Sequence, residues 1–111
     1  MTRNTEVEEG INLEVPGTAL AEEVAQRIAW HSRSAADLGE EMEAIRQQSA
    51  ADLSSTEFLR LDMRRRELAQ MMLEHEERAR FLDFVRRHLN LTRTYRLTLR
   101  ELESFEITPQ T

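Results

Sequence analysis

The chain has 111 residues and a formal net charge of −6; 32% of its residues are charged, only three are Gly and two are Pro, and none is Cys. This composition favours one helical domain over a turn-rich β fold, and it excludes a disulfide framework or a thiolate metal site. The negative net charge argues against a generic nucleic-acid binder. The N-terminus is unlike a signal peptide, and no apolar run approaches the roughly 20 residues that span a bilayer. We therefore expect a soluble, cytoplasmic protein with no membrane partner.

The first segment, residues 1–17, is predicted to be an extended or flexible arm. Within it, Ile11, Leu13 and Val15 alternate with polar residues, which is the spacing of a β-strand. A single strand needs a partner, so the alternative is a strand that adds to a partner. A Pro-Gly pair then ends the extended segment.

Residues 18–111 are predicted to form a single all-α domain built around a long hairpin. Apolar residues recur at alternating spacings of three and four along residues 18–48 and again along 55–90, the heptad pattern of long packed helices. The polar stretch between them predicts a short loop, and Ser54 and Glu57 have the spacing of a capping box. Two long helices joined by a short loop predict an antiparallel, coiled-coil-like hairpin.

The two stripes also predict how the helices face each other. If the position numbers of facing core residues add up to 103, every core residue of the first helix meets a core residue of the second. The turn then falls between positions 51 and 52, inside the polar stretch, and Glu41 lies near Arg64.

Two histidines belong to these stripes. The predicted register places His31 opposite Met72 and His75 opposite Ile28, in adjacent layers of the core. No histidine has a carboxylate or a second histidine three or four residues away, so we predict no metal site and no cofactor. We interpret His31 and His75 as polar core residues that fix the register. The alternatives are a pH-sensitive joint and a metal or haem site formed by the same two residues.

Residues 91–105 are predicted to form a shorter third helix. Leu91, Tyr95, Leu99 and Leu102 follow helical spacing. This helix either extends the second helix or folds back over the hairpin.

A second stripe on the first helix, made only of small residues at spacings of four and three, predicts close contact with another helix. Large apolar residues also lie off the main stripes, and exposed apolar patches usually mark contact sites. Either the third helix covers this surface, giving a three-helix domain, or a partner does. The predicted interface residues are Ala25, Ala29, Trp30, Ser32, Ala36, Gly39, Phe81 and Phe84.

The function predicted from these features is a non-enzymatic protein–protein interaction or assembly module. We expect it to form a homodimer that builds a helical bundle, or to bind another protein as an adaptor, a chaperone-like subunit, an inhibitor, or a phage or accessory component. No catalytic residues are predicted, since the chain has no Gly-x-Ser-x-Gly motif, no phosphate-binding glycine loop and no Cys.

The alternative function is a small nucleic-acid-associated subunit. Residues 1–57 hold 12 acidic residues and 4 Arg, whereas residues 58–111 hold 9 acidic residues and 11 Arg. All 15 basic residues are Arg, which coding bias in a GC-rich bacterial or phage genome explains simply. Clustered arginines can contact phosphates. The candidate residues are Arg86, Arg87, Arg93, Arg96 and Arg100.

Overall fold

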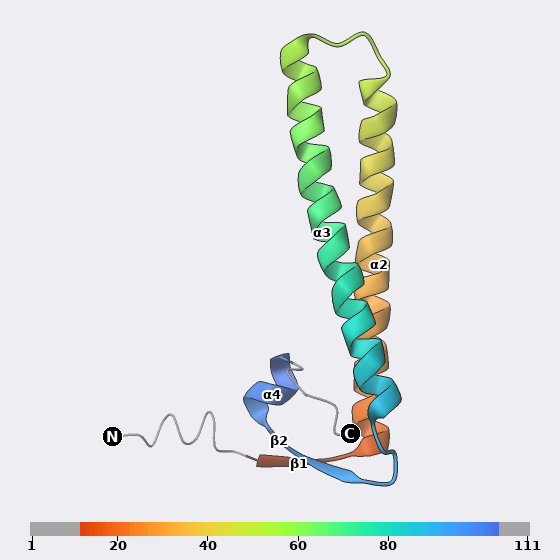
Figure 1. Ribbon diagram of the computed structural model, residues 1–111, viewed down its shortest axis with the longest axis vertical. Coiled ribbons are helices and arrows are strands. Elements are labelled where there is room, and N and C mark those ends of the chain that lie inside the picture. The colour runs from red at the N-terminus through yellow and green to blue at the C-terminus, as the bar shows by residue number, and fades with distance from the viewer. Residues whose placement is uncertain (1–11, 105–111) are drawn as a thin grey trace, which may run out of the picture. The chain divides into compact units, whose positions relative to one another are not determined.

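The structure, a computed structural model, describes residues 12–104, so Ile11 of the predicted strand lies outside the described residues. Two long helices joined by a short loop confirm the predicted helical hairpin (Figure 1). The described residues divide into two compact units: a hairpin unit, residues 27–81, and a sheet unit, residues 12–26 with 82–104. In chain order the elements are β1 (Asn12–Pro16), α2 (Gly17–Ser49), α3 (Ser55–His88), β2 (Thr94–Thr98) and α4 (Leu99–Ser104).

The predicted capping spacing marks the start of α3. The backbone N–H of Glu57 donates to Ser54 Oγ at 3.2 Å, and the Ser54 hydroxyl donates to Glu57 Oε1 at 3.1 Å. These bonds satisfy one of the free N–H groups of the first helical turn. Because the cap ends the loop at Ser54, α3 begins at the predicted residue.

The hairpin unit has a thin hydrophobic core. Within residues 27–81, all of which are described, only Leu38 and Leu68 are buried apolar residues. In a two-helix hairpin each stripe packs against one neighbouring helix only. Most stripe side chains therefore stay partly exposed to solvent. Phe58 is 50% exposed. The half-buried apolar positions of the stripes in this unit are Ile28, Ala35, Met42, Ile45, Leu61, Met72 and Ala79.

The sheet unit contains a two-stranded antiparallel sheet that was not predicted. β1 pairs with β2 so that Leu13 faces Leu97 and Val15 faces Tyr95. Leu97 is buried, as are four residues near the ends of the long helices within this unit. The buried apolar residues of the unit are Leu20, Val24, Leu82, Val85 and Leu97.

The structure decides between the alternatives at the chain ends. Residues 12–16 form the extended strand that was the alternative to a flexible arm, and its partner is β2 of the same chain. The helix expected over residues 91–105 is present only as α4, and β2 occupies much of its first half. Tyr95, Leu97 and Leu99 also alternate with polar residues, so this segment fits a strand period as well as a helical one. Pairing with β1 decides in favour of the strand.

A reciprocal capping box starts α4. The backbone N–H of Glu101 donates to Thr98 Oγ1 at 3.1 Å, and the backbone N–H of Thr98 donates to Glu101 Oε1 at 3.0 Å. Because both free N–H groups are satisfied, the helix starts directly after β2.

Gly17 occupies a place in the sheet unit with no room for a side chain. Its backbone N–H donates to the carbonyl oxygen of Arg93 at 2.7 Å. A Cβ added to Gly17 would collide with the carbonyl oxygen of Asn90 and would meet that of Arg93 at 3.0 Å. Both obstacles are backbone atoms, which yield less easily than the end of a flexible side chain.

We therefore expect Gly17→Ala to destabilise the protein by about 1–3 kcal/mol, the usual cost of overpacking. Gly39→Ala is the matched control, since the nearest neighbour of its added Cβ is the flexible Met72 side chain, with Sδ 3.8 Å away. Gly39 lies inside α2, where replacing Gly by Ala typically gains up to about 1 kcal/mol. Urea unfolding at a protein concentration too low for self-association should separate the two variants in opposite directions, and equal midpoints would contradict this account of Gly17.

Candidate protein–protein interface

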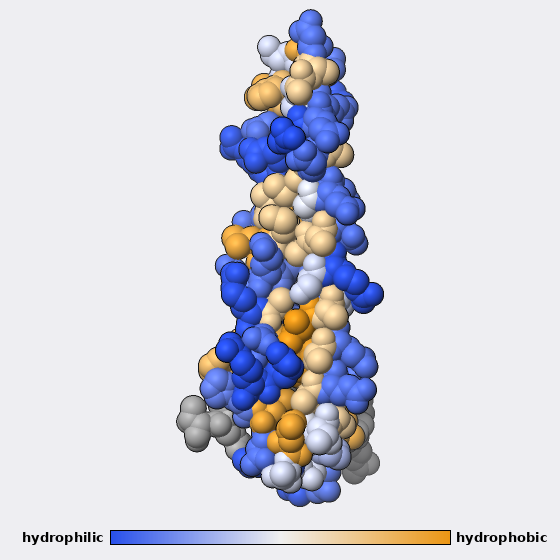
Figure 2. All heavy atoms as spheres, turned by 90° about the vertical axis from the view of Figure 1, so that its right-hand side faces the viewer, coloured by the Kyte–Doolittle hydropathy of each residue, from blue (hydrophilic) through white to orange (hydrophobic). Residues whose placement is uncertain are grey.

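The hairpin unit carries an open surface groove between α2 and α3, with a volume of about 500 Å³. Ser32, Ala36 and Gly39 of the predicted small-residue stripe line its α2 side, together with Ala35. Because these side chains are small, another helix could approach the α2 backbone closely. On the face drawn in Figure 2, hydrophobic surface lies between regions of hydrophilic surface. The α3 side of the groove is lined by Met72, Glu76, Ala79 and Arg80.

The other predicted interface residues do not all belong to this groove. Ala29 is exposed and lies seven residues before Ala36, on the same flank of α2. Trp30 lies nine residues before Gly39, which at about 100° per residue places it half a turn away from the small stripe. Trp30 is 53% exposed and packs edge-on against His75, with ring centroids 5.4 Å apart. The hairpin unit therefore has two separate flanks.

Phe81, Ala25 and Phe84 complete the predicted set. Phe81 in the hairpin unit is 38% exposed, and the Arg78 guanidinium lies 5.2 Å from the centre of its ring. Ala25 and Phe84 belong to the sheet unit and are both exposed. The Phe84 ring packs against His88, with centroids 4.1 Å apart. Neither Ala25 nor Phe84 lines the groove.

Sequence reasoning missed an apolar face on α3. Leu59 and Met63 are 60% and 64% exposed, and Leu73 is 42% exposed. Leu59 and Leu73 are fourteen residues apart, a near-whole number of helical turns, so they share a face. The sequence contains this spacing, but the prediction used only the stronger heptad stripe on the opposite side of the helix.

The two stripe histidines make direct contact on the Trp30 flank. His31 Nδ1 lies 2.9 Å from His75 Nδ1, within hydrogen-bonding distance, and the ring centroids are 5.1 Å apart. The predicted proximity is confirmed, but the register differs, since His31 was expected opposite Met72. The predicted neighbours Glu41 and Arg64 approach to 3.8 Å.

The environment of His31 disfavours its charged form. Burial lowers the pKa of His31 below its usual value of 6.5, and the positive charges of His75, Arg78 and Arg27 lower that pKa further. The same positive charges would oppose a metal cation. Among residues 12–104, no group of three or more His, Asp or Glu side chains is placed to hold a metal ion.

The candidate nucleic-acid residues lie in the sheet unit, among acidic residues. Asp83 pairs with Arg86 at 2.5 Å and with Arg87 at 3.2 Å, and the hydrogen bond from Arg86 holds the pKa of Asp83 below its usual value. Arg96 pairs with Glu14 at 3.7 Å across the sheet. Such neighbours reduce the positive potential available to a phosphate. The remaining two candidates, Arg93 beside the Tyr95 ring and Arg100 on α4, are exposed.

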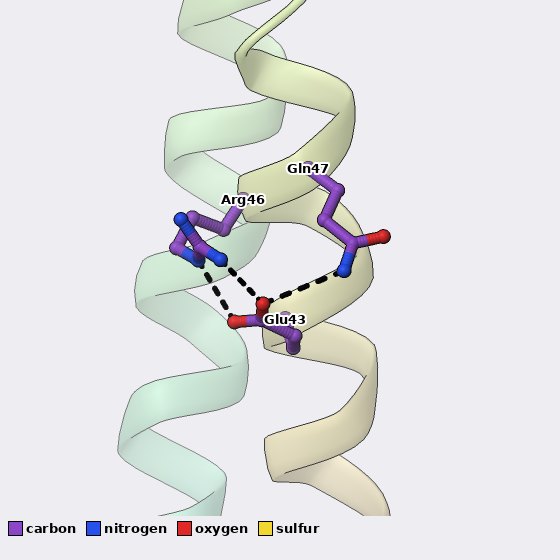
Figure 3. A network of polar contacts seen from close by, with 3 residues as sticks. All are labelled: Glu43, Arg46 and Gln47. Carbon is purple, nitrogen blue, oxygen red and sulfur yellow. Dashed lines mark hydrogen bonds and ion pairs between the residues drawn. The ribbon is translucent and has the colours of Figure 1, made fainter.

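On the surface of α2 near the loop, polar and charged side chains bond to one another within the same helix. Arg46 donates to Glu43 through Nε at 2.8 Å and through Nη2 at 2.5 Å, and Gln47 donates to Glu43 at 3.5 Å (Figure 3). The bidentate contact with Arg46 lowers the pKa of the Glu43 carboxyl. This solvated network contrasts with the small, weakly polar wall of the groove on the same helix.

Comparisons of the chain with protein-family models, curated proteins and solved structures find no match. Within residues 12–104, none of the helices combines the length and the apolar character needed to cross a bilayer.

Proposed function

We propose that this chain is a non-enzymatic helical assembly module that works as a homodimer, with the groove faces of two hairpins packed together in a helical bundle. The observation that carries the proposal is the thin core of the hairpin unit. Leu38 and Leu68 are its only buried apolar residues, although its heptad stripes continue through many more positions. Fully burying a side chain such as Leu or Ile stabilises by about 1.5–3 kcal/mol. A second pair of helices would bury the apolar stripe side chains that one hairpin leaves partly exposed.

The groove suits a second copy of the same chain. Its α2 wall is built from small residues, which allow helix axes to approach within about 8–10 Å. On the α3 side, Glu76 and Arg80 stand four residues apart, one acid and one base. In the proposed dimer the two-fold axis passes between these two positions, so that Glu76 of each protomer meets Arg80 of its partner and the contact occurs twice with the roles exchanged. The charges of Glu76 and Arg80, which form the rim of the groove on α3, are thus complementary to those of a second copy.

A charge exchange at the rim tests this pairing. Glu76→Arg places like charges opposite each other at both ends of the two-fold contact, which should weaken association by about tenfold or more. Adding Arg80→Glu restores opposite charges with their positions exchanged, so the double variant should recover the association. Both variants keep the residues of the helix core unchanged.

The measurement is co-purification of an untagged copy with a tagged copy when both are expressed together. The wild-type pair and the exchanged double variant should be recovered together, and Glu76→Arg alone should be recovered poorly. Equal recovery in all three cases would remove the rim from the interface. Failure of the untagged wild type to co-purify would contradict the proposed homodimer itself.

The outer apolar face of α3 supports a role in joining proteins. Leu59, Met63 and Leu73 do not line the groove, so groove-to-groove packing leaves them available. A dimer carries this face twice, which suits an adaptor or accessory subunit that holds two copies of another protein.

A further inference from the structure

The contact between His31 and His75 joins the two long helices within the hairpin unit. The two Nδ1 atoms lie 2.9 Å apart, and both side chains are half-buried. Trp30 closes over the pair, with its ring 4.8 Å from His31 and 5.4 Å from His75, edge-on in both cases. This cluster interrupts the mostly apolar stripes of the two helices, and neither histidine lines the groove.

A contact between two Nδ1 atoms depends on the protonation state of both rings. In the neutral pair, one Nδ1 carries a proton and donates it, while the other Nδ1 accepts through its lone pair. When both rings are protonated, each Nδ1 carries a hydrogen and no acceptor remains. Double protonation therefore replaces an attraction between the helices with a repulsion.

The surrounding charges make this repulsion stronger. From α3, His75 and Arg78 act on His31, and from its own helix Arg27 does so. All three groups are basic. Together with burial, they lower the pKa of His31, so the ring is neutral in the folded hairpin at pH values where a free histidine is partly charged.

We propose that His31 and His75 form an acid-sensitive latch, which holds α2 to α3 at neutral pH and is released by protonation. The latch does not depend on the proposed dimer, since both residues belong to one hairpin. Its stabilising effect is complete above pH 6.5, the ordinary pKa of histidine, and is lost as the pH falls through the lower folded-state pKa of His31. The unfolded chain binds its proton first, which gives this sign.

Trp30 provides a direct readout because it is the only Trp in the chain. A nearby imidazolium quenches indole fluorescence, so titration of the wild type from pH 8 to pH 5 should show quenching with a midpoint below 6.5. His31→Leu with His75→Leu removes the latch and should give a flat curve. His88→Gln changes the third histidine, which bonds to the carbonyl oxygen of Phe84, and should titrate like the wild type.

Thermal unfolding at fixed protein concentration shows whether titration releases the helices. Between pH 7.5 and pH 5.5 the unfolding midpoint of the wild type should fall by about 5 °C or more, and that of the double Leu variant by less than half as much. The carboxyls of Glu43, Asp62 and Asp83 have lowered pKa values, which keeps their titration outside this window. Leu fits these stripe positions, so the double variant should fold.

The single variant His75→Gln offers a second test that keeps a polar side chain. It removes one of the positive groups that lower the pKa of His31, so the fluorescence midpoint should move up toward 6.5. The latch is overturned by flat fluorescence in the wild type, by the same quenching in the double Leu variant, or by an unmoved midpoint in His75→Gln. Quenching without the difference in thermal stability also overturns it, because the pair would then titrate without holding the helices.

Discussion

Ala29→Leu combined with Ala36→Leu should convert the proposed dimer into a helical monomer. Ala36 lines the groove, and Ala29 is exposed two turns earlier on the same flank of α2. Adding bulk to a close helix contact costs about 1–3 kcal/mol per site, and a two-fold interface contains each site twice. Since about 1.4 kcal/mol is a factor of ten, the four affected sites should weaken association by roughly three decades or more. Leu is nearly as good a helix former as Ala, so the helices themselves should persist.

Ala44→Leu is the matched control for this double variant. Ala44 is exposed on the same helix and does not line the groove, so the same chemical change should leave the proposed dimer intact. Circular dichroism should show equal helicity in all three proteins, and sedimentation velocity should show a slower species only for the double variant. If the double variant sediments like the wild type, the small stripe is not the interface.

Leu68→Ala should have the largest effect on stability. Leu68 is fully buried, and in the hairpin unit only Leu38 is comparably enclosed. Removing a buried Leu side chain typically costs about 2–5 kcal/mol, because it loses burial and leaves a cavity. Small domains have a total stability of about 5–15 kcal/mol, so the loss is a large share of it.

Leu59→Ala makes the same chemical change at a side chain that is 60% exposed on the same helix. It should cost less than about 1 kcal/mol, because little burial is lost and Ala favours the helix. Urea unfolding measured at one protein concentration should therefore give widely separated midpoints. Similar midpoints for the two variants would show that the hairpin core does not depend on Leu68.

The hairpin could be predicted from the sequence because its signals are local. Helical spacing is set by neighbours three and four residues apart, and Ser54 and Glu57 mark the start of α3 by themselves. The sheet could not be predicted in the same way. Leu13 and Leu97 pair across more than eighty residues, and the segment around Tyr95 fits either a strand or a helix until its partner is known.

In the candidate site, too, local features could be predicted and contacts between distant segments could not. Ser32, Ala36 and Gly39 line one groove, as expected from their spacing on one helix flank. Trp30 was grouped with them because it lies off the main stripe, although its angular position already separated it from them. The contact between His31 and His75 required the register of two helices, which a repeating stripe leaves open to a shift by one layer. Spacing along one helix was therefore a better guide than register between helices.

The most direct test of self-assembly is the mass of the wild-type chain in solution. Sedimentation equilibrium at pH 7.5, from low to high micromolar concentration, measures that mass without dependence on shape. Self-assembly through the hairpin predicts twice the 13.0 kDa of one chain, with dissociation only at the lowest concentrations. A mass of 13.0 kDa at every concentration would contradict it.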